Sequence, residues 1–398
     1  MKTIFLGDRE MLKNKKILLG ITGGIAAYKA VDLASKLVKE GAIVKTIMTK
    51  NACEFISPIT VKSITHQSVS TKMFDAEAQI EHISLADWAD IVIIAPATAN
   101  IIGKTANGIA DDLLSTTIMA STGPILFVPA MNVHMFENVI VQKNIANLTN
   151  SGYYFMEPEI GKLACGYEGK GRFPKVTEII YYIKTHLNYP RNFVGEKVLV
   201  TAGANREKLD PMRFLTNHSS GKMGLSIARA AAIRGADVTL IYGNVVAEIP
   251  SYLGKAIFAE SAVEMDKMVN LKFSENKTII MVAAVSDYTP AKAETQKIKK
   301  NGNLNLKLIR TKDILAELGK QKKADQVLVG FAAESENIVA NARKKLKIKN
   351  LDFIVANNLA VAGKNETNVT LIDSQNEQKI NGCKFEVAHK ILDKIFSK

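Results

Sequence analysis

The chain has 398 residues, which exceeds the usual length of one domain, about 100–200 residues, and predicts two or three domains. Hydrophobic residues make up 47% of it and charged residues 23%, which excludes a mainly disordered or low-complexity protein. The formal net charge of +13 leaves two interpretations open: a protein that binds nucleic acid, and a protein whose small ligands carry phosphate groups.

The sequence shows no sign of export, of a membrane span or of a structural metal site. Segment 1–16 lacks the apolar stretch of a secretory signal, and the longest apolar run, Ile91–Ala97, is far shorter than the roughly 20 residues of a membrane helix. The cysteines Cys53, Cys165 and Cys383 lie far apart and form no CxxC pair, which argues against a zinc site or a disulfide framework. We expect a cytoplasmic protein that binds neither a membrane nor nucleic acid.

Short apolar runs alternate with helical patterns through the first half of the chain. Lys16–Leu19 predicts a buried strand, Gly20–Gly24 a tight turn, Ile25–Lys39 a helix and Ile43–Met48 the next strand. This unit is typical of a parallel sheet covered by helices. Further strands are expected at Ile91–Ala95 and Pro124–Val128, and the pattern lasts to about Leu187.

Residues 188–192 interrupt this pattern, and a second series of elements follows. A strand and turn are predicted at Lys197–Gly203, a helix from Gly221 to Arg234, and strands at Val238–Tyr242, Ile279–Val285, Val327–Ala332 and Phe353–Ala356. We therefore predict an α/β protein of two doubly wound, mostly parallel-sheet domains, residues 1–190 and 191–398.

The first glycine-rich turn, Gly20–Gly24, joins a strand to a helix, an arrangement that binds phosphate through backbone N–H groups and the helix N-terminus. It lacks the GxGxxG spacing, and no acidic residue lies within Thr46–Lys50, where an NAD-binding protein would carry one. The turn therefore favours a mononucleotide such as FMN, with a tight turn that binds nothing as the alternative.

Several side chains of the first half are candidates for chemistry. Asn132 follows the strand at 124–128 and would bind a carboxylate or an amide, or serve as a turn residue. His82 lies between apolar residues, which fits a packed side chain as well as a catalyst. Cys165 lies in a glycine-rich loop with Lys170 and Arg172, whose charge would lower a thiol pKa; a surface cysteine is the alternative.

The second half carries its own candidates for binding phosphate. Asn217–Gly224 combines small polar groups with a lysine before a helix, although it is not a Walker A motif. Asp287 ends a predicted strand, where a carboxylate holds Mg²⁺ or ribose or belongs to a turn. The basic clusters 297–300 and 343–349 are either solvated faces or groups that neutralise a triphosphate.

The order of these motifs resembles a known family. GITGGIAAYK, EHISLADWAD, APATAN, PAMN and ACGYEGKGR are similar to flavin-dependent phosphopantothenoylcysteine decarboxylases, whereas TAGANREKLDPMRFLTNHSSGKMG, AAVSDY, KIKK and VGFAAE resemble CTP-using phosphopantothenate–cysteine ligases. Together they resemble the bifunctional bacterial enzymes of coenzyme A synthesis over about residues 14–397. Residues 1–13 lie outside this pattern, and Ala204 and Asn205 depart from the more usual Gly and Thr.

For the second half, the resemblance implies that CTP activates 4′-phosphopantothenate as an acyl-cytidylate, which the amine of cysteine then attacks. Asn217 would bind the acyl intermediate, Lys297 would be catalytic, and Asp287 would contact CTP and Mg²⁺. The other residues that the resemblance assigns to CTP are Lys312, Asp313, Ile314, Leu315, Phe331, Lys345 and Lys349.

For the first half, the resemblance implies FMN-dependent decarboxylation of 4′-phosphopantothenoylcysteine to 4′-phosphopantetheine. His82 would be catalytic, Asn132 would hold the substrate carboxylate, and Cys165 would donate a proton. The residues expected to bind FMN are Thr22, Gly23, Gly24, Thr49, Ala97, Thr98, Asn100 and Ser115. The family further implies a homo-oligomer, a dodecamer.

Two other functions fit parts of the sequence. A flavin- or nucleotide-binding regulator that contacts nucleic acid would use the positive charge, but it would not require His82, Cys165, Asp287 and Lys297 together. A flavin decarboxylase that acts on the C-terminal cysteine of peptides would leave the NHSSGKMG half without a role.

Overall fold

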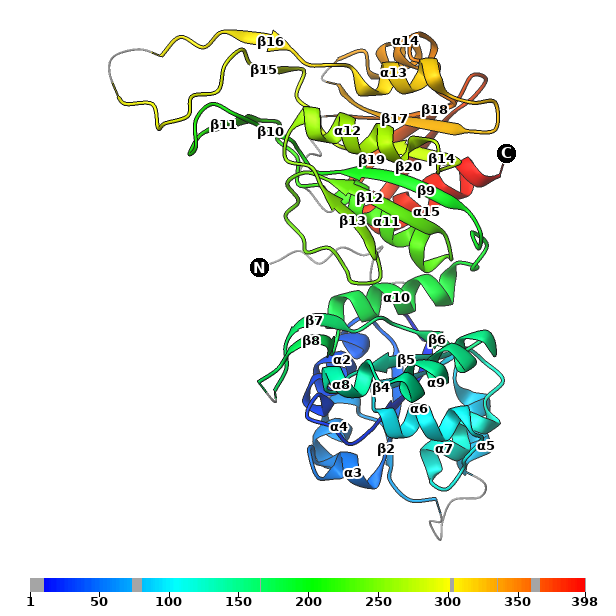
Figure 1. The fold of residues 1–398 in the computed structure, drawn as a ribbon. Coiled ribbons are helices and arrows are strands. Elements are labelled where there is room, and N and C mark those ends of the chain that lie inside the picture. Colours follow the sequence, from blue (N-terminus) through cyan, green and yellow to red (C-terminus); the bar gives the residue numbers. More distant parts are fainter. Residues whose placement is uncertain are drawn as a thin grey trace. The chain divides into compact units, whose positions relative to one another are not determined.

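The computed structural model describes residues 11–73, 81–164, 166–300, 304–334, 336–358 and 366–397. The chain divides into two compact units, Met1–Tyr189 with Pro250–Tyr252, and Pro190–Ile249 with Leu253–Lys398. Each unit is built on a mostly parallel sheet with helices, which confirms the α/β prediction (Figure 1).

The first unit contains a six-stranded parallel sheet in the order β3-β2-β1-β4-β5-β6. Its strands are β1 (Lys16–Ile21), β2 (Ile43–Met48), β3 (Val69–Ser70), β4 (Ile91–Ala97), β5 (Ile125–Pro129) and β6 (Tyr154–Phe155), beside an antiparallel hairpin of β7 (Glu159–Lys162) and β8 (Glu168–Arg172). Its helices are α2 (Ala27–Lys39), α3 (Lys50–Cys53), α4 (Pro58–Thr65), α5 (Glu81–Trp88), α6 (Ala99–Ala106), α7 (Leu113–Ala120), α8 (Val133–Phe136), α9 (Val139–Asn150) and α10 (Val176–Asn188).

Strand β1 has the pattern of a strand covered on both faces. Ile17, Leu19 and Ile21 pack into the core on one side of the sheet, while Leu18 packs into the core on the other, because successive side chains of a strand point to opposite faces. In register, Leu18 lies between Lys45 of β2 and Val92 of β4. The run of apolar residues in β1 is therefore required by burial on both sides.

Helix α2 shows why the first βαβ unit forms. Its buried residues, Ala27, Ala30, Leu33, Ala34 and Leu37, recur at the spacing of one helix face, and this face packs on the sheet. The helix is followed by Gly41, whose φ of 87° a glycine adopts without strain. From β1 the chain adds strands first toward one edge of the sheet, β2 and β3, and then toward the other, β4 to β6. The point between β1 and β4 is therefore the switch point, where ligands bind in open α/β sheets.

The second unit contains an eight-stranded sheet in the order β13-β12-β9-β14-β17-β18-β19-β20, in which only the β18–β19 and β19–β20 pairs are antiparallel. Its strands are β9 (Lys197–Ala202), β12 (Asp237–Tyr242), β13 (Lys255–Phe258), β14 (Thr278–Met281), β17 (Val327–Glu334), β18 (Phe353–Asn358), β19 (Glu366–Ile372) and β20 (Glu377–Cys383). Its helices are α11 (Lys222–Ile233), α12 (Ala262–Phe273), α13 (Ile314–Gln321), α14 (Ile338–Ile348) and α15 (Lys384–Phe396).

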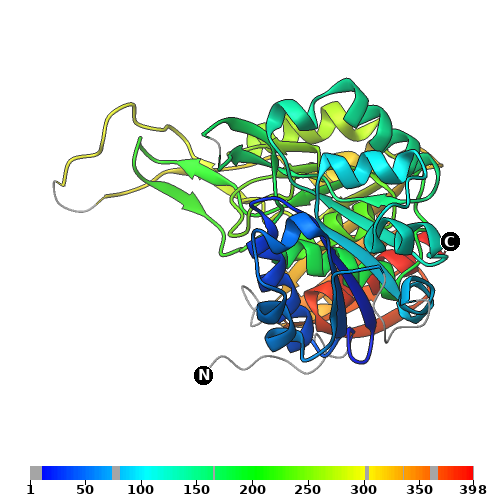
Figure 2. The same ribbon diagram turned by 90° about the horizontal axis from the view of Figure 1, so that it is seen from below.

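Two antiparallel ribbons extend from the main sheet of the second unit. One is formed by β10 (Arg206–Lys208) and β11 (Phe214–Thr216), the other by β15 (Tyr288–Pro290) and β16 (Leu308–Arg310). Both views show them side by side, reaching away from the sheet of this unit (Figures 1 and 2).

The strand predicted at Ile279–Val285 is shorter in the structure, where β14 ends at Met281. The backbone N–H groups of Val282 and Ala283 both donate to Oγ1 of Thr201, each at 3.0 Å. A side chain of the neighbouring strand thus replaces the ladder partner, and the chain turns at the edge of the sheet.

Candidate functional site

The turn after β1 is tied to the end of β4 through one buried hydroxyl. Oγ1 of Thr22 donates to the backbone oxygen of Pro96 at 2.6 Å and accepts from the backbone N–H of Thr98 at 3.2 Å. Because β1 and β4 flank the switch point of the sheet, this pair of bonds fixes the two loops where a ligand is expected. The structure thus brings Thr22 and Thr98 together.

Gly23 makes the closest backbone approach of this turn. A Cβ atom at this position would lie 2.3 Å from Cβ of Asn51 and 2.8 Å from its backbone carbon, so no other residue fits without movement. A Cβ at Gly24 would meet only Cγ2 of Thr98, at 3.6 Å, which is an ordinary contact. The turn therefore needs a glycine at the first position far more than at the second.

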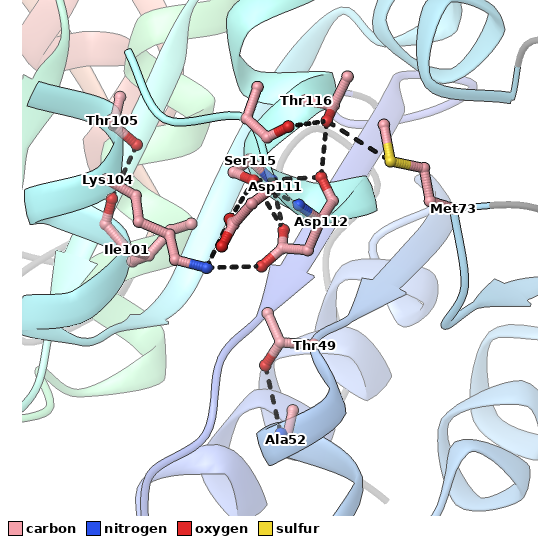
Figure 3. A network of polar contacts seen from close by, with 11 residues as sticks. Thr49, Ala52, Met73, Ile101, Lys104, Thr105, Asp111, Asp112, Ser115 and Thr116 are labelled. Carbon is pink, nitrogen blue, oxygen red and sulfur yellow. Dashed lines mark hydrogen bonds and ion pairs between the residues drawn. The ribbon is translucent and has the colours of Figure 1, made fainter. Parts of the chain in front are cut away.

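A cavity of about 200 Å³ opens beside this turn, and we call it the small cavity. Its lining contains five of the residues expected to bind the cofactor: Thr22, Gly23, Thr49, Thr98 and Asn100. Thr49 is also the N-cap of α3, where its hydroxyl accepts from the N–H of Ala52 at 3.2 Å (Figure 3).

Lys104, at the rim of the small cavity, is neutralised by two carboxylates, whereas Lys50 adds a positive charge to the same lining. Nζ of Lys104 lies 2.7 Å from Asp111 and 3.2 Å from Asp112, as Figure 3 shows. Partial burial lowers the pKa of Lys104, but the hydrogen bonds to Asp111 and Asp112 outweigh this effect and leave the pKa above its ordinary value. Lys104 and Asp112 both line the cavity, so its net charge from these groups is not positive.

A larger cavity of about 600 Å³ adjoins the small one, since Gly23 and Thr98 line both. Asn132 lines this large cavity and is the N-cap of α8, where its Oδ1 accepts from the N–H of His134 at 2.8 Å. Leu163 and Ala164, which directly precede Cys165, line it as well. Cys165 itself lies outside the described residues, so its predicted role stays a prediction.

The β7–β8 hairpin holds the wall of the large cavity. The N–H of Met131 donates to the backbone oxygen of Gly171 at 3.0 Å, and a Cβ at Gly171 would lie 2.3 Å from the oxygen of Met131. Lys29 and Arg172 bring two positive charges to the lining. Burial and the charge of Arg172 hold the pKa of Lys29 below its ordinary value.

Three of the predicted residues of the first unit do not line either cavity. His82 is half-buried on α5, a helix that packs against α7. Ala97 is buried, and its carbonyl accepts from the N–H of Ala130 at 3.2 Å, which joins the ends of β4 and β5. Ser115 is buried and forms a capping box with Asp112 at the start of α7, so its hydroxyl supports that helix.

The second unit has a cavity of about 190 Å³ at the corresponding edge of its sheet, and we call it the lysine cavity. It is lined by the turn His218–Gly224, by Val282–Ala284 and Phe331 from neighbouring strands and loops, and by Ala333, Asn357, Thr367, Val369 and Lys384. Gly221 has a φ of 71°, and a Cβ at Gly224 would lie 2.7 Å from the oxygen of Thr201. Glycines thus allow α11 to begin directly against β9.

Asn217 joins the two loops that border this cavity. Its Nδ2 donates to the backbone oxygen of Val285 at 3.0 Å and reaches that of Ala284 at 3.4 Å. Asp287 is exposed and does not line the cavity, while its carbonyl accepts from the N–H of Thr311 at 3.0 Å. Asn217 therefore ties together two loops that border the cavity without lining it, and Asp287 lies further along the second of these loops.

Most lysines predicted to bind a nucleotide are paired with carboxylates. Lys312 lies 3.1 Å from Asp266, Lys345 pairs with Glu334, and Lys349 lies 2.8 Å from Asp313. Burial raises the pKa of Asp313, but the bonds from Lys349 and from the N–H of Ala316 outweigh it, so the pKa falls below its usual range.

The remaining predicted nucleotide residues have different surroundings. Phe331 lines the lysine cavity, whereas Ile314 is buried in the core and Leu315 packs against that core. Lys297 is exposed on the segment between β15 and β16. The N–H of its neighbour Ile298 donates to Asp210 at 3.1 Å, which anchors this segment.

Residues that the sequence did not single out complete both linings. Lys29 belongs to the large cavity, and Asn357, Thr367 and Lys384 belong to the lysine cavity. The last three come from β18, β19 and α15, and α15 reaches the site only after β19 and β20 have turned back antiparallel. No local motif marks them.

Within the ranges that the structure describes, no helix is both long and apolar enough to span a membrane. The same residues contain no group of three or more His, Cys, Asp or Glu side chains arranged to hold a metal ion.

Comparison with known proteins identifies relatives of both units. A family model described as "Flavoprotein" matches residues 7–188, and one described as "DNA/pantothenate metabolism flavoprotein C-terminal domain" matches residues 193–398. The chain is 46% identical to a coenzyme A biosynthesis bifunctional protein CoaBC of Bacillus subtilis, over 97% of each chain. It is 43% identical to the protein of the same name from Vibrio cholerae, over 89% of this chain and 90% of the relative. A crystal structure of the C-terminal domain of a CoaBC protein aligns with a TM-score of 0.44 and 38% identity, over 51% of this chain and 95% of that one.

Proposed function

This chain belongs to the bifunctional CoaBC family of coenzyme A biosynthesis, and on that premise we propose that its two units divide the two reactions between them. The protein is an enzyme with ligase and decarboxylase activities. Residues 191–398 would join cysteine to 4′-phosphopantothenate, and residues 1–190 would decarboxylate the product to 4′-phosphopantetheine. The observation that supports this division is that each sheet has cavities at its switch point, two adjoining ones in the first unit and the lysine cavity in the second.

The two adjoining cavities of the first unit fit FMN. Gly23 lets the turn pack directly against Asn51, and Thr22, Thr49, Thr98 and Asn100 provide polar groups around the small cavity. When bound, FMN would accept a hydride from the cysteine end of the substrate and later return it. Ala97 and Ser115 would support the ends of β4 and α7 without touching the cofactor.

The substrate of the first unit would lie in the large cavity. Oδ1 of Asn132 is held by the N–H of His134, which orients the amide so that Nδ2 can donate to the substrate carboxylate. Cys165, next to Leu163 and Ala164 of the lining, would supply the proton for the final reduction. The charges of Lys29 and Arg172 would attract the anionic substrate.

His82 does not line the large cavity of its own chain, and this observation supports self-association. We infer that a second copy of the chain carries His82 to the cavity that contains Asn132, in the homo-oligomer, a dodecamer, that the family resemblance implies. Light scattering on the purified protein tests the assembly: a monomer at all concentrations would contradict it.

The second unit would bind CTP in the lysine cavity, with the phosphates near the turn before α11 and Phe331 against the nucleoside. Asn217, held by Val285 and Ala284, would orient the acyl intermediate beside the cavity. Lys297, which is exposed, would stabilise the charge of the departing pyrophosphate. A nucleotide that used Lys345 and Lys349 would have to displace Glu334 and Asp313.

Mg²⁺ would accompany CTP in this site. The ion takes most of its ligands from phosphates and water, so one carboxylate, Asp287, suffices on the protein side. This agrees with the absence of a multi-carboxylate cluster among the described residues.

The experiment that tests the proposed function is a mixture of the purified protein with 4′-phosphopantothenate, cysteine, CTP and Mg²⁺, analysed by mass spectrometry. We expect 4′-phosphopantothenoylcysteine to form and to be converted to 4′-phosphopantetheine. A protein that consumes no CTP would contradict the role of the second unit, and one that accumulates only the first product would contradict that of the first.

A further inference from the structure

Lys384 occupies an unusual position in the lysine cavity. It is the first residue of α15, more than 150 residues after the turn His218–Gly224, and it lies outside every motif of the sequence. The start of α15 is fixed, because the N–H of Glu386 donates to Sγ of the N-cap Cys383 at 3.5 Å. The side chain of Lys384 is partly buried at the cavity wall.

A second lysine faces the same space. Lys222 is the first residue of α11, and it lines the cavity together with the hydroxyl residues Ser219 and Ser220. Burial, and then the charge of Lys222, hold the pKa of Lys384 below its ordinary value. Two positive groups therefore lie at one cavity from opposite parts of the chain.

Lys384 has no acidic partner at the cavity among the residues that the structure describes. Among the described residues, the lining contains neither Asp nor Glu, and Lys384 forms no ion pair with any of them. This differs from Lys345 and Lys349, which are paired with Glu334 and Asp313. A partly buried ammonium without a carboxylate is costly, and an anionic ligand would relieve the cost.

We propose that Lys384 binds the phosphate chain of the nucleotide, opposite Lys222 and the serines of the turn before α11. This inference rests on the proposed function of the second unit and adds to it a binding residue that no motif marks. The chemistry required is that of a polyphosphate, because two ammonium groups, two hydroxyl residues and a helix N-terminus surround one small space.

The test compares three variants of the full chain. Lys384→Gln removes the charge, Lys384→Arg keeps it, and Lys390→Gln removes an exposed lysine from the same helix as a matched control. Calorimetry would measure the dissociation constant of CTP with Mg²⁺, and competition would measure that of cytidine, which has no phosphate. Thermal unfolding would verify that each variant is folded.

We expect Lys384→Gln to weaken CTP binding about ten- to hundredfold, the effect of losing one charge-assisted contact, and to change cytidine binding by less than about twofold. Lys384→Arg should keep most of the CTP affinity, and Lys390→Gln should equal the wild type. CTP binding by Lys384→Gln within about twofold of wild type would overturn the inference. So would an equal loss for cytidine and CTP, because the lysine would then act on the nucleoside or on the fold. Wild-type protein that binds no CTP would instead refute the proposed function.

Discussion

The two units place cavities at the same point of similar sheets, yet the small cavity of the first unit and the lysine cavity of the second treat charge differently. In the first unit, Lys104 at the small cavity is neutralised by Asp111 and Asp112. In the second, Lys222 and Lys384 face the lysine cavity, and its described lining holds no acid. The difference matches the ligands that we propose, since FMN carries a single phosphate at the end of the chain attached to its ring system and CTP carries three phosphates in a row. Backbone N–H groups suffice for the first, whereas the second requires positive side chains.

The largest effect is expected from a substitution in the glycine-rich turn after β1 in the first unit. Gly23→Ala should abolish flavin binding, because the added Cβ would lie 2.3 Å from Cβ of Asn51 and would force the turn to move. The ratio of flavin absorbance to protein measures this. Gly24→Ala is the matched control and should keep its flavin, since its Cβ would only reach normal contact with Thr98. Full flavin content in Gly23→Ala would show that the turn does not hold the cofactor.

The two units also differ in whether one chain supplies all the predicted catalytic residues of a site. In the first unit it does not, because His82 does not line the large cavity that contains Asn132. His82→Asn and Asn132→Gln should each remove decarboxylation. Co-refolding or co-expressing the two variants should restore part of it, because some cavities would then combine an intact Asn132 with an intact His82 from a neighbour. Ligase activity, measured in the same samples, should stay unchanged. A mixture as inactive as each variant alone would place both residues at one site of one chain.

The second unit also buries an ionisable side chain away from its cavity, His389 on α15. Burial, and then the charge of Arg234, lower the pKa of His389 to about 3, against about 6.5 in the unfolded chain. Below pH 6.5 His389 therefore binds a proton in the unfolded chain but not in the folded chain. The free energy of unfolding should fall by about 2 kcal/mol from this group by pH 5, and continue to fall toward pH 3.

Denaturant titrations at several pH values would measure this loss. His389→Leu should show a shallower pH dependence, whatever its stability at neutral pH. Identical slopes in both proteins would mean that His389 is protonated in the fold.

The smallest effect is expected at the rim of the small cavity. Asp112→Ala removes the N-cap of α7, whose carboxylate accepts from the N–H of Ser115 at 2.8 Å, and should cost about 1 kcal/mol of unfolding free energy. Asp111→Ala removes an ion pair with Lys104 and a long bond from Oγ of Ser115, but no helix cap, and serves as the control with a smaller loss. Equal losses would show that the ion pair with Lys104, rather than the helix cap, is what stabilises this region.

The sequence predicted the architecture well wherever a strand is buried on both faces. The apolar runs of β1, β4 and β5 identified their strands, and the residues that follow them marked the sheet edges where Thr22, Thr98 and Asn132 lie. The prediction was wrong at the end of β14, because Thr201 of another strand binds the N–H groups of Val282 and Ala283. Such a contact between distant residues leaves no local pattern.

Side-chain roles were harder to predict than strands. Lys384 is one of 52 Lys and Arg residues, and its place at the cavity depends on how β19 and β20 fold back. Ser115 was expected to bind FMN, whereas the structure shows it in a capping box with Asp112, three residues before it, so a local pattern was there to be found. A local motif can therefore reveal a cap, but not a residue that the fold delivers from afar.

The most direct test of the division between the units is the product that each single-unit variant accumulates. With 4′-phosphopantothenate, cysteine and CTP, Gly23→Ala should consume CTP and accumulate 4′-phosphopantothenoylcysteine. Lys297→Gln should consume no CTP, yet convert added 4′-phosphopantothenoylcysteine to 4′-phosphopantetheine. If either variant lost both reactions while remaining folded, or if neither lost one, the two reactions would not belong to separate cavities.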